Sequence, residues 1–319
     1  MAVIQDDEFD LLKLMEQSPD EMMFGGVQPV VSNVASVDDV KNLSSYAVEV
    51  KRDNKGGGTA TITVGAGFDK SGLCEYLGCE GIRLFVNFDM LRFTGSGGIE
   101  LDGGVLSSLN QGLGGISRMT ASIEAYVPSG RSLKVEGLHG VDHVETRLGS
   151  YVGFTKGEDY DFYPLSWADC DILNPIGDTG VLEDVIAERD VDVEAQLLDS
   201  VGLHLARGYQ EHFVRAACVC VERLFTVNCC RGYGLASWLL GTLPVIVQAS
   251  YSMLVGDILL IPGDFSSEAS KRGVTPKEYL SWLEGYYEHC GFNLMDVSKL
   301  KGLFVSGVGR VFRRRFLLY

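Results

Sequence analysis

The chain is short of positive charge. Its 319 residues include 27 lysines and arginines against 43 aspartates and glutamates, which gives a formal net charge of −16. Such a balance repels phosphate backbones at long range, so nonspecific coating of RNA or DNA requires a concentrated basic patch. No long block of like charge occurs, and the hydrophobic share of 46% is typical of a folded chain.

Recognisable targeting and catalytic signatures are also missing. The start, MAVIQDDEFD, is acidic and has no basic n-region, so no signal peptide is expected. The glycine tracts at 95–98 and 112–115 lack the Lys-Ser/Thr pair and the strand–helix context of a P-loop, and we interpret them as turns. The eight cysteines and five histidines form no local nucleophile signature. Free cysteines in apolar sequence are typical of a reducing setting, and a cytoplasmic location is predicted, in the host cytoplasm or the virion if the protein is viral.

Cysteine spacing does not predict a zinc site. A structural zinc site usually takes four ligands as two close pairs. Cys74 and Cys79 form one such pair, but the other cysteine group has CxC and CC spacings that match the pattern poorly. That group consists of Cys218, Cys220, Cys229 and Cys230. No cofactor is therefore expected.

Hydrophobic periodicity divides the chain into two parts. Alternation of period two predicts strands at 46–50, 59–64, 82–88, 118–127 and 133–136, the first two joined by a glycine-tipped turn. One face of the strand at 118–127, from Met119 to Val127, is expected to be buried. Its other face, with Arg118, Thr120, Ser122 and Glu124, is expected to meet solvent.

The second part has helical spacing. Leu198, Val201, Leu205 and Tyr209 favour a helical tract over 192–225, and Thr275 to Glu278 predict a capping box for a helix closed by Gly291. The predicted fold class is α+β, an antiparallel β-rich N-terminal half followed by a predominantly helical C-terminal half. We expect an N-terminal helical arm at 1–45, a β-rich domain at 46–160 and a mainly helical domain at 161–319.

An uncharged stretch at 232–256 is long enough to cross a membrane. Pro244, Gln248 and three serines argue against a membrane span, and we expect buried core or a subunit interface, broken at Pro244. Membrane association through this stretch stays as an alternative that is not favoured.

Two clusters are candidate sites. His139, Asp142 and His143 lie within five residues and could bind a transition metal if they converge, although Gly140 disfavours a helical arrangement. Arg310, Arg313, Arg314 and Arg315 are interspersed with aromatic residues and form the one concentrated basic site. These arginines could pair with an acidic surface of a neighbouring subunit or of the chain itself, or contact nucleic acid.

Three segments of the sequence occur in the same order as three motifs of a known protein family. They are Gly234–Trp238, Tyr251–Asp257, and Tyr286–Phe292 with Lys299, and they loosely resemble the palm of viral RNA-dependent RNA polymerases. The resemblance implies motifs B, C and D and covers fewer than 90 residues. It departs from the family at Ile258, where a second acidic or amide residue is usual, and at Pro164, where a metal-binding aspartate is usual.

The combined pattern favours packing over catalysis. Glycine-tipped hairpins, an uncharged apolar tract and the missing catalytic spacing are typical of a protein that assembles with copies of itself. We therefore predict a structural protein that forms a homo-oligomer, with a viral capsid or virion shell component as the expected form, and no enzymatic activity is favoured. The alternatives are a metal-dependent enzyme using His139, Asp142 and His143, a membrane-associated accessory protein, and a degenerate polymerase-palm-like protein.

Overall fold

A computed structural model describes most of the chain from residue 47 onwards. The described residues are 47–52, 57–63, 71–89, 91–92, 115–135, 144–145, 151–174, 186, 193–211, 216–251, 253–262, 269–270, 272–297, 300 and 310–316. The predicted arm at 1–45 lies outside them.

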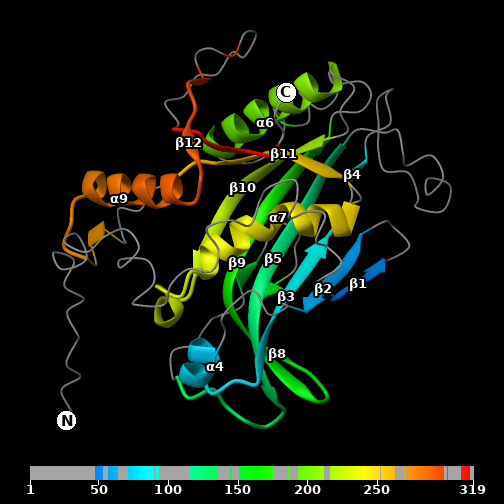
Figure 1. Cartoon of the computed structure of the whole chain (residues 1–319), viewed down its shortest axis with the longest axis vertical. Helices are drawn as coiled ribbons and strands as arrows, with labels where there is room; N and C mark the ends of the chain where they lie inside the picture. Colours follow the sequence, from blue (N-terminus) through cyan, green and yellow to red (C-terminus); the bar gives the residue numbers. More distant parts are fainter. Residues whose placement is uncertain are drawn as a thin grey trace.

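One large mixed sheet organises these residues (Figure 1). Eleven strands belong to it, and its main path runs β1-β2-β3-β5-β9-β10-β11-β13-β12, with β4 paired to β5 and β8 paired to β9. The bounds along this path are β1 Ala47–Arg52, β2 Gly58–Thr63, β3 Gly81–Phe88, β5 Gly115–Pro128, β9 Tyr160–Asn174, β10 Ala216–Thr226, β11 Leu254–Leu260, β13 Phe312–Arg315 and β12 Asn293–Leu294. The short strands are β4 Leu91–Arg92 and β8 Thr155–Lys156, and β6 Val144–Glu145 and β7 Tyr151–Val152 form a separate two-stranded sheet.

The predicted fold class is wrong. Strands outnumber helices among the described residues, and β9 to β13 extend the same sheet through the half predicted to be helical. Of the tract predicted to be helical at 192–225, residues Val193–Glu211 form the helix α6, and the later part belongs to the strand β10. Because β10 is buried on both faces over Ala216–Val221, its sequence AACVCV shows no alternation of polar and apolar residues. A short apolar run of this kind cannot be assigned to helix or strand by periodicity.

The antiparallel part of the prediction is largely confirmed. β1 and β2 form the expected hairpin, with Val48 opposite Ile62, and β3 and β5 occupy the predicted ranges. Residues 133–135, in contrast, are not a strand. The predicted solvent face of β5 is also wrong, since Thr120, Ser122 and Glu124 are all buried. Polar side chains therefore lie inside the protein at the centre of the sheet.

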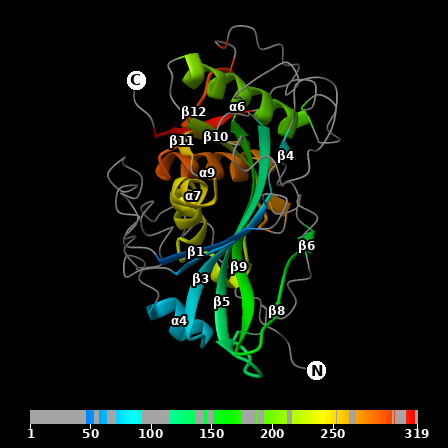
Figure 2. The same cartoon turned by 90° about the vertical axis from the view of Figure 1, so that its right-hand side faces the viewer.

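Helices cover the two faces of the sheet. α7, Leu235–Tyr251, packs on the face that carries Ala217, Val219 and Val221 of β10. α6 packs on the other face, against Cys218 and Cys220, because successive side chains of a strand point to opposite sides. Figure 2 shows α7 beside the strands and α6 across their upper end, while α4, Ser71–Leu77, lies near the opposite end. β10 and β11 are parallel because α7 connects them as a crossover.

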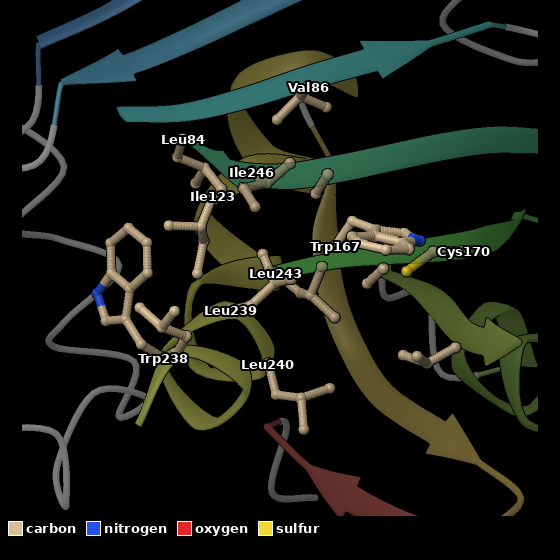
Figure 3. Packing of buried hydrophobic residues seen from close by; sticks show 14 of the residues in the cluster. Leu84, Val86, Ile123, Trp167, Cys170, Trp238, Leu239, Leu240, Leu243 and Ile246 are labelled. Carbon is tan, nitrogen blue, oxygen red and sulfur yellow. The ribbon is translucent and has the colours of Figure 1, made fainter. Parts of the chain in front are cut away.

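α7 is one continuous helix, and the break predicted at Pro244 does not occur. A proline inside a helix costs about 3 kcal/mol or more. Burial offsets that cost, because Leu239, Leu243 and Ile246 are fully buried and each contributes about 1.5–3 kcal/mol. Figure 3 shows these side chains facing Leu84 of β3 and other residues of the sheet. In the described part of the chain, no helix combines the length and the apolar character needed to cross a membrane.

The helix predicted from its capping box is confirmed as α9, Pro276–His289. The Thr275 hydroxyl accepts a hydrogen bond from the Glu278 amide, and the Glu278 carboxylate accepts one from the Thr275 amide. Gly291 follows with a φ of +83°, the left-handed conformation typical of a helix end.

Candidate functional site

The predicted histidine cluster is not covered by the structure. His139, Asp142 and His143 lie outside the described residues. A metal site there stays a prediction.

Arg313 of β13 is bound to the chain's own core. Its Nε and Nη2 atoms donate hydrogen bonds to Oδ1 and Oδ2 of Asp257 at 2.7 and 2.6 Å. Asp257 is fully buried on β11 and also accepts a hydrogen bond from the Tyr209 hydroxyl. Burial disfavours the charge of Arg313, but pairing with Asp257 outweighs it and raises the pKa of the guanidinium. Burial, followed by the proximity of Cys218 and Asp257, raises the pKa of Tyr209, so this phenol stays a hydrogen-bond donor.

The other three arginines differ in how far they reach solvent. Arg315 lies with Nε 3.9 Å from Oδ1 of Asp257, and 48% of its side chain is exposed. Arg310 pairs with Glu284 of α9 and is 52% exposed. Arg314 lies against the ring of Phe316, and partial burial lowers its pKa. Arg310 and Arg315 are therefore the members of this group that present charge to solvent.

Exposed apolar side chains lie on elements that neighbour these arginines. β13 packs on α9, where the rings of Tyr287 and Phe312 have centroids 6.0 Å apart, and β12 pairs with β13 (Figure 1). On the same elements Trp282 is 39% exposed and Leu294 is 48% exposed. We call the exposed residues Trp282, Leu294, Arg310 and Arg315 of these neighbouring elements the arginine edge.

A cluster of three carboxylates lies where α6 crosses the sheet. One oxygen each of Asp171 on β9, Asp199 on α6 and Glu222 on β10 lie within 4.8 Å of one another. Asp171 and Asp199 are buried. α6 approaches the sheet this closely because Gly202 has no side chain: a Cβ there would lie 2.6 Å from the sulfur of Cys220.

Arginines and a hydroxyl accompany the acidic residues. Arg118 on β5 lies with Nε 3.8 Å from Oδ1 of Asp171. The Thr120 hydroxyl donates to Asp169 at 2.6 Å, and Arg223 of β10 approaches the same aspartate at 3.9 Å. In the register of β5, β9 and β10, Arg118 lies opposite Asp171, and Thr120 and Arg223 lie opposite Asp169 on either side.

This arrangement suits ion binding better than nucleophilic chemistry. Three carboxylates offer the oxygen ligands that Mg²⁺ and Ca²⁺ prefer, and like charges this close favour a bound cation or a retained proton. The neighbouring Cys220 is no nucleophile, since burial raises the pKa of its thiol and keeps it protonated. Spacing in the sequence could not reveal the cluster, because its three members come from two strands and a helix.

Two of the three segments behind the polymerase resemblance are in contact, since the hydroxyls of Ser237 and Tyr286 form a hydrogen bond at 3.1 Å. Asp257, at the motif C position, is engaged by Arg313, while Asp169 lies on β9, with β10 between the two strands. Pro164 is buried within β9.

No protein-family model, no curated protein and no solved structure matched the chain.

Proposed function

We propose that this protein is a structural subunit that assembles with copies of itself through the arginine edge. The supporting observation is the combination of exposed Trp282 and Leu294 with exposed Arg310 and Arg315 on adjacent elements. Tryptophan and arginine are the residues most enriched among those that dominate binding energy at protein interfaces.

Charge complementarity favours a second copy as the partner. With a net charge of −16, the surface of another subunit offers carboxylates in excess. Arg313 is hydrogen-bonded to Asp257, whereas Arg315 lies farther from the same carboxylate. The exposed guanidinium of Arg315 can therefore bind an additional carboxylate. Attraction of this kind acts locally, between the arginines and facing carboxylates, and is screened by salt.

The backbone of β13 supports the same proposal. β11 pairs with all four residues of β13, whereas β12 pairs only with Phe312 and Arg313. Within the described strands, Arg315 therefore has a ladder partner on one side. A strand edge of this kind is a template for pairing with another chain.

The setting proposed for this assembly is the cytoplasm. All eight cysteines are free thiols, in keeping with a reducing compartment. A virion shell is one product that repeated contacts of this kind can build, and particle shape distinguishes it from a ring or a filament.

The test is the particle mass of the purified protein, by light scattering and native mass spectrometry, with electron microscopy of any large species. We expect an assembly that Arg315→Glu or Trp282→Ser weakens and that dissociates as salt rises. Lys51→Glu on β1 is the matched control, because it changes the net charge equally at an exposed position on the opposite edge. A monomer at every concentration refutes the proposal. Binding of single-stranded RNA that is lost with Arg315→Glu, without self-association, assigns the edge to nucleic acid instead.

A further inference from the structure

Phe225, near the end of β10, presents an aromatic ring to solvent beside two arginines. The residue is 41% exposed, and its ring packs on the buried Trp167 of β9 with ring centroids 4.5 Å apart. Arg223, two residues earlier on the same side of the strand, has 55% of its side chain exposed. The guanidinium carbon of Arg231 lies 6.0 Å from the centre of the Phe225 ring. We call Arg223, Phe225 and Arg231 the β10 patch.

Contacts with the sheet hold the two arginines of the β10 patch in place. Arg223 lies opposite Asp169 in the pairing of β10 with β9, and its guanidinium approaches that carboxylate at 3.9 Å. The Nε atom of Arg231 donates to the Thr226 carbonyl at 3.3 Å. A guanidinium has five N–H donors, so each arginine can also bind a carboxylate of another molecule. Aromatic and arginine side chains that are fixed in this way are typical of the residues that dominate binding at protein interfaces.

A surface of opposite charge lies at the turn between β8 and β9. Glu158, Asp159 and Tyr160 are consecutive and exposed, and Tyr160 is 38% exposed. The turn is fixed, because the Ser129 amide donates to the Asp159 carbonyl at 2.9 Å. Two carboxylates and a phenol thus stand beside one exposed cation, Lys156 of β8. We call Glu158, Asp159 and Tyr160 the acidic turn.

The β10 patch and the acidic turn do not meet within one chain. Phe225 pairs with Trp167, which follows Tyr160 by seven positions along β9. At about 3.3 Å per residue, the acidic turn therefore lies about 20 Å from the β10 patch. Figure 1 shows β8, beside this turn, at the lower end of the sheet. Two β10 patches facing each other would bring like charges together, so a contact between copies must join two different surfaces.

We propose that the β10 patch of one copy binds the acidic turn of a second copy, in a head-to-tail contact separate from the arginine edge. Phe225 and Tyr160 supply apolar area, and the arginines of the patch meet the carboxylates of the turn. Two cations suit two carboxylates better than the continuous phosphate track of a nucleic acid. The inference rests on the proposed self-assembly and gives it a direction, because a contact between different surfaces repeats from copy to copy and builds a ring or a filament.

The test mixes two variants, each of which lacks one half of the contact. Both carry Arg315→Glu, which weakens the arginine edge; one also carries Phe225→Glu and the other Asp159→Arg. Sedimentation velocity at about 150 mM salt measures each variant alone and the equimolar mixture. Each variant alone should associate at least about 10-fold more weakly than the Arg315→Glu parent. The mixture should form a 1:1 pair, since one variant keeps the acidic turn and the other keeps the β10 patch.

Glu75→Arg in the Arg315→Glu background is the matched control. It makes the same charge change as Asp159→Arg, at an exposed position on α4 that belongs to neither surface. This variant should associate as the parent does. Arg223→Gln is a second variant of the patch and replaces Phe225→Glu if circular dichroism shows that the latter is unfolded.

A mixture that stays monomeric overturns the proposal. If the unaltered protein nevertheless assembles and Arg315→Glu weakens that assembly, the head-to-tail contact alone is wrong, whereas a monomeric unaltered protein refutes self-assembly as well. Binding of a single-stranded RNA oligomer that Phe225→Glu abolishes, with no 1:1 pair in the mixture, assigns the patch to nucleic acid and also overturns the proposal.

Discussion

Replacement of Arg313 by methionine should destabilise the protein strongly, and replacement of Arg315 should not. Arg313→Met leaves the fully buried Asp257 carboxylate without the guanidinium that donates two hydrogen bonds to it. Removing one member of a buried ion pair costs about 3–5 kcal/mol, because an uncompensated charge stays inside the protein. Arg315 is half exposed and 3.9 Å from the same carboxylate, so Arg315→Met should cost less than about 1 kcal/mol.

Urea unfolding followed by circular dichroism measures both effects. All variants are compared at one low protein concentration, since any self-association makes apparent stability depend on concentration. The double variant Asp257→Asn/Arg313→Met tests the pairing itself: its cost should be smaller than the sum of the two single costs, because the single changes each leave one partner unsatisfied. Equal losses for Arg313→Met and Arg315→Met, or strict additivity in the double variant, would refute the argument.

Three further changes test other parts of the fold. Gly202→Ala places a Cβ 2.6 Å from the Cys220 sulfur and should lower the free energy of unfolding by about 1–3 kcal/mol, with partial rescue by Cys220→Ala in the same urea assay. Thr275→Ala removes the N-cap of α9 and should cost about 1 kcal/mol, seen as a lower urea midpoint with an unchanged m value. Burial raises the pKa of Glu124, against the opposing effect of Arg83, so the stability linked to this group is present below about pH 4 and is lost as the pH rises through its folded pKa. The stability of the Glu124→Gln variant relative to the unaltered protein should therefore increase as the pH rises above about 4, measured as the difference between urea midpoints at each pH, and a difference that does not change with pH would contradict this.

The sequence correctly predicted those elements whose formation depends mainly on residues close to one another in the chain. The β1–β2 hairpin follows from strict alternation, and α9 follows from a capping box, a proline at the first turn and a closing glycine. β10 was predicted as helix because it is buried on both faces, and burial by α6 and α7 is a property of the tertiary structure. The same limit explains why the buried polar face of β5 was predicted to be exposed.

The candidate sites could be predicted only in part, for a related reason. The four C-terminal arginines are adjacent in sequence and stand out there, but the engagement of Arg313 by Asp257 depends on the pairing of β13 with β11. The carboxylates of Asp171, Asp199 and Glu222 come from separate elements. Their proximity follows from strand order and helix crossing, which no spacing in the sequence encodes.

The pairing of β11 with β13 also affects how the chain is made. Arg313 follows Asp257 by 56 residues, so during synthesis the ribosome produces the buried carboxylate well before its counterion. Until β13 arrives, β11 has an open edge with an uncompensated aspartate beside it. A chain that stops between these residues therefore keeps the Asp257 carboxylate without Arg313, and the edge of β11 stays open to pairing with another strand.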